Sequence, residues 1–252
     1  MTTADTLPRE FPILVRWHTR TPFLDLASLD GIDAKIFHAM KPFPFLEIER
    51  TLTPDGYRSL VRDMPDPLLY SKSFGRRRRH GQQSHDRFVL QYHPVRTIPE
   101  TWRDFIAELK GPHYRRFVAN LLGREDFILH FHWHSTPRGC SVSPHCDAEW
   151  KLGSHIFYLN TDADWKPQWG GETLALGGGE HLNSRSAPDF DDFPIQIASR
   201  SMGNRSLIFR REEASWHGVR PLQCPVGALR KVFIVEFRRS GLVNLARTAL
   251  GF

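Results

Sequence analysis

The N-terminal half of the sequence carries hydrophobic positions mostly at helical spacing, after one early strand. Residues 41–52 alternate apolar and polar side chains, which predicts the strand, and residues 53–65 follow with the pattern of a helix. Thr53 stands where a hydroxyl can cap that helix. Residues 99–123 carry two further helical patterns, and Gly123 is placed to end the second.

Beyond residue 125 the hydrophobic pattern changes to period two, separated by turns rich in Pro, Gly, Asp and Asn. The predicted strands are residues 126–134, 153–160, 170–176, 205–211 and 230–237. Strands that follow helices in this way predict a mainly β fold with flanking helices, arranged as an antiparallel sandwich or jelly roll. We expect a single domain over residues 1–252. In it, a region of about 1–125 supports a core of about 126–240, and residues 241–252 form a short C-terminal helix.

The composition narrows the class of protein. Apolar residues make up 40% of the chain, enough for a packed core, and 34 basic against 28 acidic residues give a net charge of +6. That excess alone does not indicate a nucleic-acid partner. Three cysteines are too few for a disulfide framework and suit a reducing compartment. No stretch approaches the ~20 apolar residues of a membrane span, and no signal peptide is evident. We therefore expect a cytoplasmic protein without membrane association.

Residues 145–147, His-Cys-Asp, offer three potential metal ligands in a row. Side chains at i and i+2 of a strand project to the same side, so His145 and Asp147 can share an ion while Cys146 points away. His217, after the strand at 205–211, offers a third ligand. Two imidazoles and one carboxylate form the open triad of non-haem Fe(II) oxygenases. A His-x-Asp pair is weak evidence by itself in a chain with 13 histidines.

The surrounding sequence, PHCDAEWKLGSHIFYLNTDADWKPQWGGETLAL from Pro144 to Leu176, makes the signal specific. It resembles the Fe(II)/2-oxoglutarate-dependent dioxygenases of the prolyl-4-hydroxylase-like group. Their core runs from a His-x-Asp strand through a YLN…DW strand end and a W-GGE-L turn to a distal His and a basic residue. The matching positions are His145/Asp147, Tyr158 to Asn160, Asp164-Trp165, Trp169 to Leu174, His217 and Arg230. The resemblance spans about residues 127–237, and His217 follows Asp147 by 70 residues.

This resemblance implies a double-stranded β-helix core in which His145, Asp147 and His217 bind Fe(II). It also implies 2-oxoglutarate as co-substrate, chelated to the iron, with its far carboxylate held by a buried cation. Arg230 is favoured for that role, because guanidinium binds carboxylate through two hydrogen bonds and stays charged. Arg230 follows His217 by 13 residues, a longer interval than is usual in the family. Strand alternation alone does not choose between Arg230 and Lys231.

Four residues are candidates for contacts in the same pocket. Tyr158 matches a family tyrosine whose hydroxyl contacts the co-substrate, although a core aromatic with a solvated tip is an alternative. Ser154 lies on the same predicted strand face and could make a second contact. Thr173 begins a strand near the pocket and is a candidate substrate contact. His134, from the strand before the metal loop, is another, with a structural histidine as its alternative.

Glu236 shares the predicted strand face of Arg230. An inward carboxylate is costly unless it is paired. We hypothesise that it faces a cationic group of the substrate. The alternative is a salt bridge to a local arginine such as Arg238 or Arg210.

The run Arg76–Arg79 lies between two glycines and has three interpretations: a nucleic-acid patch, a lid over an anionic or polar substrate, or a solvated loop. No aromatic residue interleaves with the arginines, which counts against single-stranded nucleic acid. Arg87 is separate from the run. It opens a strand-like segment in a region that family enzymes use for substrate contacts.

The function implied by the resemblance is oxidation of a substrate by O2, with decarboxylation of 2-oxoglutarate to succinate and hydroxylation as the default outcome. The intact Asp147 counts against a halogenase. We expect a small-molecule substrate, such as a free amino acid or related metabolite, and no nucleic-acid partner. The alternatives are an oxygenase acting on a protein side chain or nucleic acid, a cupin-like dioxygenase without co-substrate, and a non-catalytic metal-binding module. The sequence does not predict an oligomeric state.

Overall fold

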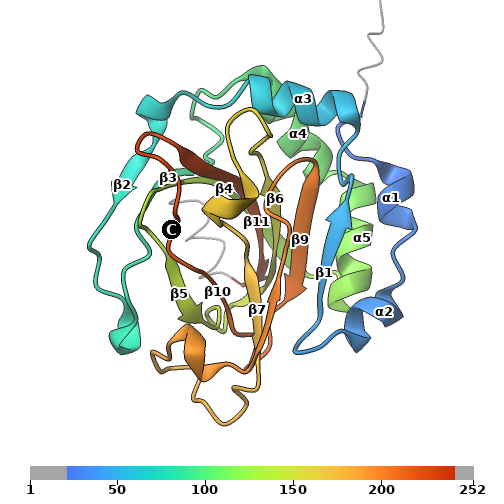
Figure 1. Ribbon diagram of the computed structural model, residues 1–252. Helices are drawn as coiled ribbons and strands as arrows, with labels where there is room; N and C mark the ends of the chain where they lie inside the picture. The colour runs from blue at the N-terminus through green and yellow to red at the C-terminus, as the bar shows by residue number, and fades with distance from the viewer. Residues whose placement is uncertain (1–21, 242–252) are drawn as a thin grey trace, which may run out of the picture.

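The computed structural model describes residues 22–241. Its strands form two antiparallel sheets, of order β1-β9-β6-β11-β4-β3-β2 and β5-β10-β7-β8, so the predicted jelly-roll core is confirmed (Figure 1). The larger sheet contains β1 (Phe45–Glu49), β2 (Ser71–Ser73), β3 (Arg87–Gln91), β4 (Phe127–Pro137), β6 (Lys151–Tyr158), β9 (Arg205–Arg210) and β11 (Leu229–Arg239). The smaller sheet contains β5 (Val142–His145), β7 (Leu174–Gly177), β8 (Ile195–Ala198) and β10 (His217–Val219).

The α-helices of the described residues all precede the long strands of the core. They are α1 (Leu26–Asp30), α2 (Ala34–Ala39), α3 (Pro54–Arg62), α4 (Glu100–Lys110) and α5 (Pro112–Leu122). Figure 1 shows α1, α2 and α5 along one side of the molecule, beyond β1 and β9. Single 3-10 turns are found at η1 (Pro67–Leu69), η2 (Arg79–Gly81), η3 (Pro167–Trp169) and η4 (Phe190–Asp192).

Local sequence signals explain where the predicted elements begin and end. The Thr53 side chain accepts a hydrogen bond from the Gly56 amide at 3.1 Å and so caps α3, as predicted. Gly123 ends α5 in the left-handed conformation, with φ of 67°. The strand expected at 170–176 begins only at Leu174, because Gly170 and Gly171 have φ values of 80° and 100° that a regular strand does not accept.

The two faces of the larger sheet have different roles. On one face, Phe131 and Trp133 of β4 and Phe233 of β11 form part of the hydrophobic core. They pack there with Trp102 and Phe105 of α4. Residues of the opposite parity on the same strands face the space between the sheets, where they line a cavity. These are His130, His132 and His134 of β4, and Arg230, Val232, Ile234, Glu236 and Arg238 of β11. Helix packing on one face therefore decides which side chains line the cavity.

Strands from the N-terminal region also belong to the larger sheet. β1 pairs with β9, and β3 pairs with β4, so β1, β2 and β3 extend that sheet at both edges. The short strands β8 and β10 were not predicted, because three or four residues carry too little periodicity. The strand expected to carry both His145 and Asp147 ends at His145, as β5. The expected C-terminal helix lies, apart from Gly241, outside the described residues. Within residues 22–241, no helix combines the length and hydropathy needed to cross a bilayer.

Candidate active site

The candidate metal ligands meet where β5 and β10 pair. His217 lies opposite His145 in the register of these strands, and their ring centroids are 4.3 Å apart. Asp147 lies two residues beyond the end of β5, in the loop that leads to β6. One ligand atom from each of the three buried residues lies within 4.8 Å of the other two. Cys146 packs instead near an apolar cluster around Trp216 and does not line the cavity that His145, Asp147 and His217 share.

Backbone contacts select the tautomer of both imidazoles. Nδ1 of His145 lies 3.0 Å from the Ser143 carbonyl, and Nδ1 of His217 lies 3.0 Å from the Ser215 carbonyl. A carbonyl oxygen only accepts, so each Nδ1 carries the proton and each Nε2 keeps its lone pair. Burial lowers the pKa of both rings, that of His145 well below its usual range. Neutral rings with a free Nε2 are the form that ligates a metal.

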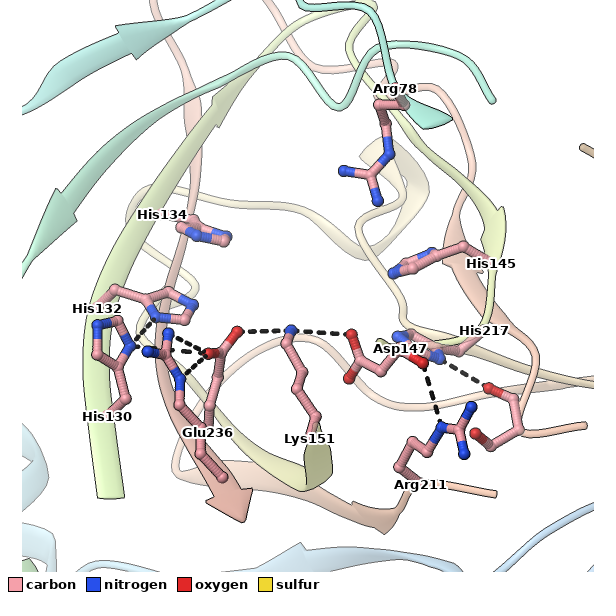
Figure 2. Close-up of polar contacts among 12 residues, drawn as sticks. Arg78, His130, His132, His134, His145, Asp147, Lys151, Arg211, His217 and Glu236 are labelled. Carbon is pink, nitrogen blue, oxygen red and sulfur yellow. Dashed lines mark hydrogen bonds and ion pairs between the residues drawn. The ribbon is translucent and has the colours of Figure 1, made fainter. Parts of the chain in front are cut away.

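The carboxylate of Asp147 is held on one side only. Lys151 Nζ donates to Oδ1 of Asp147 at 2.9 Å, and Arg211 donates to the Asp147 carbonyl at 3.2 Å. Figure 2 shows Asp147 between Lys151 and His217. The second carboxylate oxygen of Asp147 therefore stays available to an ion.

Arg230 lies at the start of β11 and is buried, with 5% of its surface exposed. Its Nε donates to the Gly171 carbonyl at 2.6 Å, and its Nη2 donates to Oγ1 of Thr173 at 3.3 Å. Gly171 allows this approach, since a Cβ there would lie 3.1 Å from the Arg230 side chain. Lys231 points the other way and forms an ion pair with Asp164 at the surface. Of the two candidates for the buried cation, Arg230 therefore lines the cavity and Lys231 does not.

Tyr158 and Thr173 lie around this cation, whereas Ser154 lies opposite Glu236 in the register of β6 and β11. The Tyr158 hydroxyl bonds to Thr173 Oγ1 at 3.0 Å and to Ser199 Oγ at 2.6 Å, and the guanidinium of Arg230 lies 5.7 Å from the Tyr158 ring centroid. Tyr158 therefore helps to fix Thr173, which contacts Arg230. Thr173 and Ser154 both line the cavity itself.

His134 and Arg87 form another part of the cavity wall. Arg87 Nε donates to Nε2 of His134 at 3.2 Å, and Arg87 Nη1 donates to the His85 carbonyl at 2.7 Å. Because His134 accepts at Nε2, its ring is neutral, and burial keeps its pKa well below the usual range. The structure places both candidate residues on the cavity.

Glu236 has cationic partners within the protein. Lys151 Nζ lies 2.6 Å from its Oε1, and Arg238 donates to its Oε2 from Nε at 3.0 Å and from Nη2 at 2.8 Å. Lys151 therefore joins Glu236 to Asp147 in one buried chain of charges (Figure 2). The salt bridge to Arg238, stated above as the alternative to a cationic substrate group, is present. Arg210 pairs with Glu212 instead.

A second cluster of potential ligands lies beside the first. Among residues 22–241, His130, His132 and Glu236 also bring ligand atoms within 4.8 Å of one another. Lys151 and Arg238 already contact the carboxylate of this cluster. Two cations at contact distance oppose binding of a divalent ion there. The His145, Asp147 and His217 group is therefore the stronger candidate.

The arginine run divides between the cavity and its surroundings. Arg78 lines the cavity, whereas Arg76 and Arg77 are exposed and line a larger outer pocket. Sequence reasoning did not single out Lys151, His130 or His132. The two histidines had a signal, because they share period-two spacing with His134. Lys151 follows Asp147 by four residues, but its second partner, Glu236, is distant in the chain.

The comparisons with known proteins identify the fold. No protein-family model matches the sequence, and no curated protein matches it significantly. A solved prolyl-4-hydroxylase from Pseudomonas putida matches with a TM-score of 0.56 at 17% identity, over 82% of this chain and 98% of that one. The chain has the prolyl-4-hydroxylase fold.

Two further solved structures share that fold. A prolyl hydroxylase from Trichoplax adhaerens, in complex with a peptide fragment of hypoxia inducible factor, matches with a TM-score of 0.52 at 14% identity, over 82% of this chain and 86% of that one. EvdO2 from Micromonospora carbonacea var. aurantiaca, complexed with 2-oxoglutarate, matches with a TM-score of 0.53 at 14% identity, over 83% and 91%.

Proposed function

We propose that the protein is an Fe(II)/2-oxoglutarate-dependent dioxygenase that hydroxylates a small molecule. One observation carries the proposal: the His145, Asp147 and His217 triad and the buried guanidinium of Arg230 line the same cavity of about 220 Å³. An open metal site and a buried cation are the two parts that a 2-oxoglutarate oxygenase needs.

The triad suits Fe(II) by its donor set. It offers two neutral imidazoles and one carboxylate, without a thiolate, which leaves positions open for the co-substrate and O2. Structural zinc sites are closed and usually rich in cysteine, so this donor set does not favour a structural zinc ion. Lys151 and the Ser143 and Ser215 carbonyls orient the ligands before an ion binds.

Arg230 suits the far carboxylate of 2-oxoglutarate. Within residues 22–241 it forms no ion pair, although 95% of its surface is buried. A buried unpaired charge is costly, and a bound carboxylate would offset that cost. One structural neighbour, EvdO2, has been solved with 2-oxoglutarate. When bound, iron and 2-oxoglutarate supply the oxidising chemistry, in which O2 is consumed, 2-oxoglutarate becomes succinate and CO2, and the substrate gains a hydroxyl group.

The side chains of this protein position the reactants. Tyr158 and Thr173 hold Arg230 at one end of the cavity, and Lys151 holds Asp147. Apolar walls from Ile156, Val232 and Ile234 separate these polar groups. The small volume of this cavity favours a small molecule over a folded partner. The Trichoplax enzyme, solved with a peptide, makes a protein side chain the second candidate.

Anaerobic spectroscopy and succinate formation test the proposal. Protein purified without O2 and loaded with Fe(II) should show visible charge-transfer absorption when 2-oxoglutarate is added, and succinate should form once O2 is admitted. His145→Ala should abolish both signals, whereas replacing exposed His181 by Ala should change neither. Absence of both signals in the iron-loaded wild type would refute the oxygenase function.

A further inference from the structure

The cavity carries more positive than negative charge. Its lining contains five cationic side chains, Arg78, Arg87, Lys151, Arg230 and Arg238, against the two carboxylates of Asp147 and Glu236. Fe(II) and the 2-oxoglutarate dianion would together add no net charge. The excess of three positive charges therefore remains in the loaded site. Excess charge that is partly withdrawn from water is costly, so it indicates a further, anionic ligand.

Most of these cations have an assigned partner. Lys151 contacts both Asp147 and Glu236, and Arg238 binds Glu236. Arg230 is the proposed anchor of 2-oxoglutarate. Arg78 and Arg87 are left, and neither forms an ion pair within the part of the chain that the structure describes.

Arg87 is fixed in place but not neutralised. Its Nε donates to His134 and its Nη1 donates to the His85 carbonyl, and both acceptors are uncharged. The third nitrogen, Nη2, remains available to a ligand. Burial, followed by repulsion from Arg78, lowers the pKa of Arg87 to about 10. The guanidinium is therefore still charged at neutral pH, on a rigid strand, facing the cavity.

Arg78 approaches the same cavity from a loop. Figure 2 shows its guanidinium projecting toward the space between His134 and His145. Its Nε lies 3.4 Å from the Gln82 amide oxygen, which leaves both terminal nitrogens for a ligand. Two mutually repelling guanidinium groups on one cavity match a single anion that both can bind.

The outer pocket has the same character. It has a volume of about 780 Å³ and shares Arg78, His85, Arg87 and Asp147 with the inner cavity. Six arginines line it against the carboxylates of Asp147 and Glu149, and Glu149 is already paired with Arg185. A basic entrance raises the local concentration of anions and speeds their association.

We propose that the small-molecule substrate carries an anionic group, a carboxylate or a phosphate, which Arg78 and Arg87 bind together beside the metal triad. The inference rests on the proposed function for its chemistry, but the anion site itself stands on the geometry of the two arginines. The Arg76–Arg79 run thus has a divided role, in which Arg78 binds substrate and Arg76 and Arg77 line the entrance.

Binding measurements on matched probes test this inference. Protein loaded with Mn(II) and 2-oxoglutarate would be titrated calorimetrically with inorganic phosphate, phenyl phosphate, benzoate and neutral benzamide. We expect at least one anion to bind and benzamide to bind at least about tenfold more weakly. Preference for benzoate or for the phosphates decides between carboxylate and phosphate.

Variants localise the site. Arg78→Gln should weaken binding of the preferred anion by about tenfold or more, and this variant should fold, because Arg78 makes one long hydrogen bond in the structure. Arg87→Gln should have a similar effect and Arg87→Lys should restore part of the affinity. The control, Arg103→Gln, changes an exposed arginine on α4 that lines neither pocket.

The outcomes separate this inference from the oxygenase function. Equal binding of benzamide and benzoate, no anion binding at all, or unchanged affinity in Arg78→Gln and Arg87→Gln would overturn the anion site while charge-transfer absorption with 2-oxoglutarate stays intact. Loss of that absorption with retained, arginine-dependent anion binding would instead overturn the oxygenase function and support the anion site.

Discussion

Replacing Lys151 by Met should destabilise the protein and loosen the metal triad. Lys151 joins the candidate ligand Asp147 to Glu236, at 2.9 Å and 2.6 Å. Met preserves most of the volume and removes the charge. After the change, Glu236 keeps Arg238, whereas Oδ1 of Asp147 loses its lysine donor.

The size of the effect follows from the burial of this chain of charges. Burial by itself lowers the pKa of Lys151, but attraction from Asp147 and Glu236 outweighs it and raises the pKa from 10.5 to about 12. That rise corresponds to about 2 kcal/mol in favour of the charged form in the folded protein. Breaking a buried ion pair costs about 3–5 kcal/mol. Because Glu236 retains Arg238, we expect a loss somewhat below that range, about 2–3 kcal/mol.

Urea unfolding of the metal-free protein at pH 7 measures this free energy. A double-mutant cycle with Glu236→Gln isolates the Lys151–Glu236 pair, for which we expect a coupling of about 1–3 kcal/mol. Replacing exposed Lys72 by Met is the matched control and should change stability by less than about 0.5 kcal/mol. A similarly small loss in Lys151→Met, or a coupling near zero, would refute the reasoning.

Three further predictions concern the co-substrate, the pH dependence and the core. Arg230→Gln should weaken 2-oxoglutarate binding by about 30-fold or more, because the far carboxylate loses a charged partner; Fe(II) affinity should not change, and anaerobic titration checks both. His155, buried against Tyr114 and Ser206, has its pKa lowered to about 3 by burial, so the folded protein loses stability relative to the unfolded chain as pH falls from 6.5 toward 3. When the pH is lowered from 6.5 to 4.5, the free energy of unfolding of His155→Gln should therefore fall by about 2–3 kcal/mol less than that of the wild type. Urea unfolding at the two pH values measures both losses, and equal losses in the two proteins would contradict the prediction. Phe233→Ala, at a fully buried position between α4 and the larger sheet, should cost about 3–5 kcal/mol, and a loss below about 1 kcal/mol would show that the core relaxes around the cavity.

Hydrophobic periodicity and local motifs determined the elements of this protein. Period-two alternation located β4, β6, β9 and β11, and the caps of α3 and α5 followed from Thr53 and Gly123. The His-x-Asp pair and its distance to His217 pointed to the candidate triad. These features are local, because side-chain direction along a strand and backbone preference at a cap depend on near neighbours.

The partners of the charged side chains were decided by the tertiary structure. Strand alternation alone did not decide whether Arg230 or Lys231 faces the cavity. In the structure α4 packs on the Phe233 face of β11, so the opposite face, which carries Arg230, lines the cavity. Glu236 had an inward face in the sequence, but its pairing with Lys151 exists only because β6 lies beside β11. The order of strands in the sheet brings together residues far apart in the chain, and the alternation within one strand does not show which strand lies beside it. For that reason the sequence offered candidate residues for the site, and only the fold showed which of them line the cavity and that Arg78 and Arg87 lie there together.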